Sequence, residues 1–295
     1  MFPFSYSALS GLLLATAVAA HGLVSTIDVD GTTYQGYPAF NPVNNPQRII
    51  RAMYNNGPIT DVASLAIACN GKNEPAALVA NVTAGSFITY TWGSWPKGHT
   101  GPITNYMASC GDDCRTFNAS NGNWFKIDET GYDSSTKLWA TDKLFTNSLK
   151  YSVMIPQGIP SGQYLVRHEI LALHATNAPQ YYPSCIQVQV NGGTGSLSSI
   201  ASSDFTTFPG AYNPSDPGYK FNIYYPPYTS YPIEGPQPIY AASNLANSTS
   251  PSNSMNPTNS TTPTTSSLLP SSTSSDTPGS SPSVRFCRPL KLGPG

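Results

Sequence analysis

The stretch YLVRHEILALH, residues 164–174, has the composition of a long buried β-strand. A turn region, PQGIPSG at residues 156–162, precedes it. After a loop predicted over residues 175–183 comes CIQVQV, residues 185–190, in which apolar and polar side chains alternate. Such alternation is typical of a strand with one buried face. We therefore expect two strands here, joined by a short loop.

The rest of the chain up to residue 242 repeats this pattern of short apolar segments between turns. Further strands are expected at residues 22–31 (ending in an Asp-Gly turn), 77–83, 86–92, 124–128 and 150–155. The 24 Gly, 28 Pro and 11% aromatic residues favour short strands over a helical bundle. Residues 35–60 and 95–103 lack a period and are predicted to be loops. The fold class expected is an all-β, antiparallel β-sandwich with long loops.

The length and net charge of the chain argue against some classes of function. The chain has 295 residues, of which 10% are charged, and a formal net charge of −1. No basic patch for nucleic acid or an anionic membrane surface is expected from this balance. We expect no nucleic-acid partner and no membrane association, since no apolar stretch is long enough to cross a bilayer.

The N-terminus has the pattern of a secretory leader. Residues 8–17 form a short uncharged apolar run, followed by the small residues Val18, Ala19 and Ala20. Cleavage after Ala20 makes residues 1–20 a signal peptide and leaves His21 as the first residue of a secreted, extracellular protein. Cleavage one residue earlier is the alternative. An N-terminal histidine can chelate a metal through its α-amine and Nδ1, and Cu(II) prefers such nitrogen ligands.

From Ser243 onward the composition changes. Ser, Thr, Pro and Asn dominate residues 243–295, which cannot bury enough apolar surface to fold and are expected to form a disordered tail. This leaves residues 21–242 as one domain. Glycosylation sequons begin at four asparagines: Asn81, Asn118, Asn247 and Asn259.

Five cysteines occur in a chain destined for an oxidising compartment, where disulfides are the default. Cys110 and Cys114 can close a small loop, which leaves Cys69 and Cys185 as a long-range pair and Cys287 unpaired in the tail. A zinc site built on Cys110 and Cys114 is the alternative, although no second ligand pair has a usual spacing.

Besides His21, two further histidines lie where they could contribute to a functional site. His99 follows Gly98 in a loop, and His174 ends the long strand. Gln180 and Tyr182 are two residues apart, so in an extended segment their side chains share one face. Taken singly, His174 and Tyr182 have ordinary structural interpretations. His168, inside the apolar strand, is expected to be a structural partner.

Together, these motifs resemble one family over roughly residues 21–240. They are HG at 21–22, GHTGP at 98–102, NYMA at 105–108, YLVRHE at 164–169, ALH at 172–174, QYYPSC at 180–185, PGAY at 209–212 and DPG at 216–218. The chain resembles the fungal lytic polysaccharide monooxygenases of auxiliary activity family 9, formerly glycoside hydrolase family 61.

The resemblance implies an immunoglobulin-like or fibronectin III-like sandwich with a flat substrate face and one copper ion. His21 would bind copper through its amine and Nδ1, His99 through its other ring nitrogen, and Tyr182 would be axial. His174 and Gln180 would hydrogen-bond an oxygen species. The remaining implied roles are a stacking aromatic, Tyr231, and two disulfides, Cys69–Cys185 and Cys110–Cys114.

The function implied is a secreted, monomeric copper monooxygenase. It would use an external electron donor and H2O2 or O2 to oxidise C1 or C4 of β-1,4-glucan, in cellulose or a related hemicellulose. A hydrolase would need a paired acid and base, which the sparse carboxylates do not suggest. The alternatives are a non-catalytic polysaccharide-binding sandwich and a zinc hydrolase.

Overall fold

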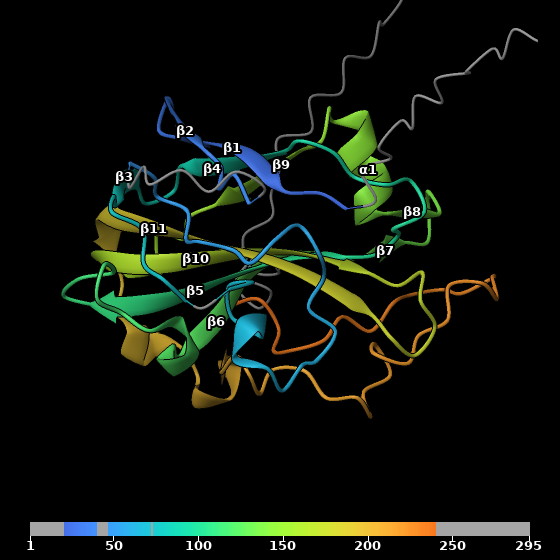
Figure 1. Ribbon diagram of the computed structural model, residues 1–295. Coiled ribbons are helices and arrows are strands. Elements are labelled where there is room, and N and C mark those ends of the chain that lie inside the picture. Colours follow the sequence, from blue (N-terminus) through green and yellow to red (C-terminus); the bar gives the residue numbers. More distant parts are fainter. Residues whose placement is uncertain (1–20, 40–46, 72, 240–295) are drawn as a thin grey trace, which may run out of the picture. The chain divides into compact units, whose positions relative to one another are not determined.

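Two β-sheets packed face to face form the body of the protein (Figure 1). The structure is a computed structural model that describes residues 21–39, 47–71 and 73–239. The predicted leader at 1–20 and the tail at 243–295, with Asn247, Asn259 and Cys287, lie outside the described residues.

The smaller sheet has four strands in the order β2-β1-β4-β9. Its strands are β1 Val24–Val29, β2 Thr32–Gln35, β4 Phe87–Trp92 and β9 Lys150–Met154. The Asp30-Gly31 pair, at φ values of 42° and 80°, makes the predicted turn between β1 and β2. The strand β2 itself was not predicted.

The larger sheet has six strands in the order β12-β6-β5-β10-β11-β3. Its strands are β3 Ala80–Thr83, β5 Ile103–Gly111, β6 Trp124–Thr130, β10 Pro160–Ala172, β11 Gln180–Thr194 and β12 Phe205–Thr206. Among the described strands all pairs are antiparallel except β3 with β11, which is parallel.

The remaining elements are short. They are the β7–β8 hairpin (Tyr132–Asp133 and Leu138–Trp139), the helix α1 Ala140–Thr146, and the 3₁₀ turns η1 Leu65–Ile67, η2 Ala119–Asn121, η3 Leu197–Ser199 and η4 Ser202–Asp204. In the described part of the chain, no helix has the length and apolar character needed to cross a membrane.

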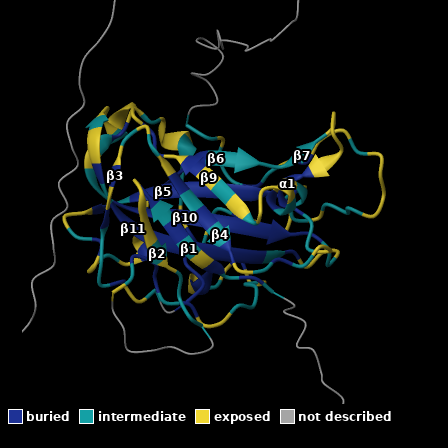
Figure 2. Ribbon diagram, turned by 90° about the horizontal axis from the view of Figure 1, so that it is seen from above, coloured by how far each residue is buried: buried dark blue, intermediate teal, exposed yellow. Residues whose placement is uncertain are grey.

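The larger sheet is buried on both faces, as Figure 2 shows for β5, β10 and β11. Val166 and Ile186 belong to the core between the sheets, whereas Leu165 and Tyr181 pack into a second cluster on the opposite face. Burial on both faces explains why β10 is a nearly continuous apolar run instead of an alternating one.

Besides β2, other elements differ from the sequence prediction. The strand β5 was not predicted, because its buried residues include the polar Thr104 and Asn105. β11 begins at Gln180, so the second half of the loop expected at residues 175–183 is strand. The helix α1 was also not predicted.

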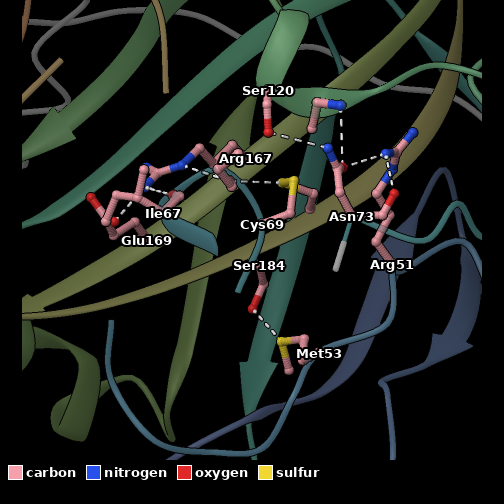
Figure 3. Close-up of a disulfide and its surroundings, with 12 residues drawn as sticks. Arg51, Met53, Ile67, Cys69, Asn73, Ser120, Arg167, Glu169 and Ser184 are labelled. Carbon is pink, nitrogen blue, oxygen red and sulfur yellow. Dashed lines mark hydrogen bonds and ion pairs between the residues drawn. A yellow bond between two sulfur atoms is a disulfide. The ribbon is translucent and has the colours of Figure 1, made fainter. Parts of the chain in front are cut away.

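Both disulfides implied by the resemblance are present. Cys69–Cys185 ties the segment after η1 to β11 (Figure 3), and Cys110–Cys114 closes a small loop at the end of β5. Arg167 supports the first disulfide by donating from Nε to the carbonyl of Ala68 (3.0 Å). The zinc alternative for Cys110 and Cys114 is therefore wrong.

Candidate functional site

Three predicted residues from distant parts of the sequence meet at one end of the sandwich. His21 precedes β1, His99 lies in the loop between β4 and β5, and Tyr182 is on β11. The ring centroids of His21 and His99 are 5.8 Å apart, with the rings nearly perpendicular at 80°. The centroids of His21 and Tyr182 are 5.9 Å apart.

Close backbone approaches hold this arrangement. A Cβ at Gly22 would lie 2.1 Å from the carbonyl oxygen of Ser94, so only glycine lets the chain after His21 pass the 93–99 loop. Ser94 Oγ also donates to the carbonyl of His21 (3.2 Å). At the other end of the loop, a Cβ at Gly101 would lie 1.9 Å from the carbonyl oxygen of Leu171.

Trp95 supports both the loop and the aromatic residue beneath it. Its indole Nε1 donates to the carbonyl of His99 (2.9 Å), and its ring contacts Tyr182 edge-on with centroids 4.9 Å apart. Trp95 is buried. No role was predicted for Trp95, although the sequence places it only four residues before His99.

His174 lies two residues past the end of β10 and stacks on His99, with ring centroids 3.9 Å apart. Two ring nitrogens at this stack, Nε2 of His99 and Nδ1 of His174, are buried and make no hydrogen bond to any described residue. Because buried polar atoms are nearly always paired, these two atoms point to a ligand.

Gln180 and Tyr182 share one face of β11, as their spacing predicted. The Tyr182 hydroxyl donates to Gln180 Oε1 (2.8 Å). Burial raises the pKa of Tyr182, so its phenol stays protonated at neutral pH.

The imidazoles of His99 and His174 are neutral at physiological pH. Burial, and next the neighbouring His174 and His21, lower the pKa of His99 to about 4. Burial, and next His21, also lower the pKa of His174. Neutral imidazole is the form that binds a metal.

His168 is a structural residue, as its place in the strand predicted. It is fully buried, accepts a hydrogen bond from Trp92 Nε1 (3.0 Å), and pairs through Nδ1 with Asn105 Oδ1 (2.8 Å). Since Nε2 accepts, Nδ1 carries the proton. Burial, together with Arg167, lowers its pKa to about 3.

The structure corrects the expected role of Tyr231. Its ring is only 7% exposed and packs against Trp139 and Phe221, so it cannot stack on a sugar. The exposed tyrosines nearby are Tyr224 (60%) and Tyr225 (79%), and the Tyr224 hydroxyl donates to the carbonyl of His174 (2.8 Å). Nothing in the sequence distinguished these among the 18 tyrosines.

Within the described ranges, no group of three or more His, Cys, Asp and Glu side chains is gathered where it could hold a metal ion.

The family model for Auxiliary Activity family 9 (formerly GH61) matches residues 21–231. The chain belongs to this family. Among curated relatives, AA9 family lytic polysaccharide monooxygenase A of Geotrichum candidum is 41% identical over 249 residues, covering 81% of this chain and 83% of the relative. The monooxygenase A of Gloeophyllum trabeum is 42% identical over 247 residues, covering 79% and 75%.

Solved structures of AA9 proteins have the same fold. A cellulose-active polysaccharide monooxygenase from M. thermophila matches with a TM-score of 0.67 and 36% identity, over 74% of this chain and 98% of that one. A glycoside hydrolase family 61 member from Hypocrea jecorina matches with a TM-score of 0.67 and 33% identity, over 74% and 99%.

As an AA9 lytic polysaccharide monooxygenase, the chain is a copper-dependent oxidoreductase that acts on polysaccharide. Membership of this family favours the monooxygenase over a non-catalytic binding module or a zinc hydrolase.

Proposed function

We propose that the mature protein begins at His21 and binds one copper ion through the amine and Nδ1 of His21 and Nε2 of His99. The observation that carries this proposal is the buried Nε2 of His99, which has no hydrogen-bond partner among the described residues and belongs to a ring 5.8 Å from that of His21. Two imidazole nitrogens and an amine form a donor set that suits copper. The third donor is a backbone amine, which agrees with the lack of a third side-chain ligand among the described residues.

Tyr182 would lie beside the copper ion as a neutral phenol, since its ring centroid is 5.9 Å from that of His21. The phenol is neutral because it keeps its proton, which it donates in a hydrogen bond to Gln180 Oε1. A neutral phenol oxygen is a weak ligand, so Tyr182 would add little to copper binding and would limit access to the ion from its own side.

His174 and Gln180 would bind the oxygen co-substrate, O2 or H2O2. The unpaired Nδ1 of His174 is available as a hydrogen-bonding atom, and stacking on His99 fixes its ring. Gln180 Nε2 donates no hydrogen bond to a described residue, while its Oε1 accepts from Tyr182. When bound, copper would supply the one-electron chemistry needed to oxidise a C–H bond, with electrons from an external donor.

The substrate proposed is β-1,4-glucan, oxidised at C1 or C4 or both. The half-buried His21, His99, His174 and Gln180 leave the site open, and Tyr224 offers an exposed ring next to His174. Such a ring can pack against the apolar face of a glucosyl unit. Cellulose and related hemicelluloses present that face.

Secretion follows from the proposed chemistry, since the amine exists only after a leader ending at Ala20 is removed. We therefore propose an extracellular monomer of residues 21–295, with the domain at 21–242.

One experiment tests both the leader and the metal. Mass spectrometry of the secreted protein is expected to show His21 as the first residue, and one Cu(II) per chain is expected to give a tetragonal EPR signal. With copper, ascorbate and H2O2, the protein should release oxidised oligosaccharides from cellulose. A variant beginning at Ala20 is the control and should lose most of its copper affinity. A mature protein that begins elsewhere and still releases oxidised products would refute the proposed copper site.

A further inference from the structure

A groove of about 320 Å³ opens on the surface beside the sequon at Asn118. Its apolar lining includes Tyr54 and Leu65, which are 51% and 65% exposed. Asn118 itself lines the groove, together with Ser64, Ala66, Gly71, Asn73 and Ser120. The volume falls at the low end of small-molecule sites, about 300–1,000 Å³. Exposed large apolar side chains beside polar ones are typical of binding surfaces.

Hydrogen bonds to Oδ1 fix the side-chain carboxamide of Asn118. Asn118 is the N-cap of η2, and its Oδ1 accepts from the backbone N–H of Ser120 (3.0 Å) and from Asn73 Nδ2. Asn73 is held in turn by Arg51 NH1 (2.7 Å), and Figure 3 shows Asn73 lying between Arg51 and Ser120. Asn118 Nδ2 donates no hydrogen bond to any described residue. An N-linked sugar is attached at this nitrogen, and Oδ1 keeps its capping role after attachment.

We propose that Asn118 carries an N-linked glycan whose first N-acetylglucosamine packs in this groove against Tyr54. In the attachment, Asn118 Nδ2 bonds to C1 of the sugar and loses a proton, and C1 releases the diphosphate of a lipid-linked oligosaccharide donor. The proposal rests on the proposed secretion, because this donor is used in the secretory pathway.

The lining matches the chemistry of the sugar. A pyranose ring has an apolar C–H face, which the exposed Tyr54 ring and Leu65 can cover. Its hydroxyl and acetamido groups need polar partners. Ser64 Oγ accepts from the backbone N–H of Ala66 (3.2 Å), so its hydroxyl proton remains to be donated.

The second described sequon provides a matched control. Asn81 is exposed on β3, and its Oδ1 accepts from Asn191 Nδ2 (3.3 Å). It does not line the groove at Tyr54. A glycan at Asn81 should therefore leave stability nearly unchanged, whereas the glycan at Asn118 should raise it.

The test uses full-length protein secreted from a yeast or filamentous fungal host. Glycopeptide mass spectrometry is expected to find the glycan at Asn118. Ser120→Ala removes the sequon but keeps the capping side chain, and Ser120→Thr preserves the sequon. We expect Ser120→Ala to lower the Tm by about 2–4 °C, which corresponds to a destabilisation of about 1 kcal/mol in a domain of this size. Ser120→Thr and Asn81→Gln should change the Tm little.

A double-mutant cycle isolates the packing. Tyr54→Ala should lower the Tm in the glycosylated protein and have less than half that effect in the Ser120→Ala background. Endoglycosidase H, which leaves the first N-acetylglucosamine, should not change the Tm. Additive effects of Tyr54→Ala and Ser120→Ala, or an unmodified Asn118, would overturn the proposal.

Neither the glycopeptide mass spectrometry nor the Tm measurements depend on copper binding or on turnover. An inactive protein that shows the coupling refutes only the proposed function, and an active protein without sugar at Asn118 refutes only this inference.

Discussion

The imidazole rings of His99 and His174 stack with their centroids 3.9 Å apart, and each ring buries one nitrogen that makes no hydrogen bond to a described residue. The two residues come from different segments, the β4–β5 loop and the end of β10. The stack thus couples the proposed metal ligand to the residue proposed to bind the oxygen co-substrate.

The two histidines should separate metal binding from turnover. His99→Ala removes a proposed ligand and should weaken copper binding by more than about 100-fold. His174→Ala should weaken it by about tenfold, the lower end of the range for residues that only orient ligands, but should reduce turnover by about 100-fold. Calorimetric copper titration and assays on cellulose measure the two effects. Parent-like copper affinity in His99→Ala would show that its imidazole is not a ligand.

Gly22→Ala should destabilise the protein and disturb His21. The new Cβ would lie 2.1 Å from the Ser94 carbonyl oxygen, so the backbone must shift, at a cost of about 1–3 kcal/mol. Gly98→Ala is the matched control, because its Cβ would meet nothing within 4 Å. We expect thermal unfolding and copper affinity to change in the first variant and to stay near parent values in the second. Equal effects in the two variants would contradict the close approach at Gly22.

Tyr224→Ala should weaken binding to insoluble cellulose by about tenfold, since it removes the exposed ring beside His174. Tyr231→Leu removes the aromatic ring and should leave the binding of the folded protein unchanged, because the Tyr231 ring is buried. Pull-down isotherms on cellulose compare the two variants. Weaker binding by folded Tyr231→Leu, with Tyr224→Ala unchanged, would restore the role that the resemblance implied for Tyr231.

The buried Glu234 should make stability depend on pH. Burial raises its pKa from 4.5 to about 7, even though its Oε2 accepts from the Tyr181 hydroxyl (2.7 Å). The folded protein therefore keeps a proton that the unfolded chain releases above pH about 4.5. The free energy of unfolding should fall by about 1–3 kcal/mol as the pH rises from about 4.5 to about 7.

Glu234→Gln removes this titration, so its stability should change less with pH over the same interval. Denaturant unfolding at several pH values measures the difference. Parallel pH profiles of the two proteins would mean that Glu234 titrates alike in the folded and unfolded states.

The two disulfides should differ in their contribution to stability. Cys69–Cys185 spans 116 residues and Cys110–Cys114 spans four. In the chain-entropy model they contribute up to about 5 and about 2 kcal/mol. Denaturant unfolding of the Cys69→Ser/Cys185→Ser and Cys110→Ser/Cys114→Ser variants should show the larger loss in the first. The reverse order would mean that native-state contacts outweigh loop entropy.

Much of the site could be predicted from the sequence because its signals are local. The glycines around His99 and the two-residue spacing of Gln180 and Tyr182 depend only on neighbouring residues. The alternation in residues 185–190 indicated a strand for the same reason. The strand β5 gave no such signal, since Thr104 and Asn105 are polar residues buried by distant segments.

The sequence by itself determined the short-strand architecture, the disulfide candidates and the residues that we propose as copper ligands. Only the tertiary structure decided that His174 stacks on His99, that Trp95 supports both the loop and Tyr182, and that Tyr224 is exposed while Tyr231 is buried. Periodicity and turns arise from adjacent residues, whereas the exposure of one tyrosine among 18 depends on which distant segments pack over it.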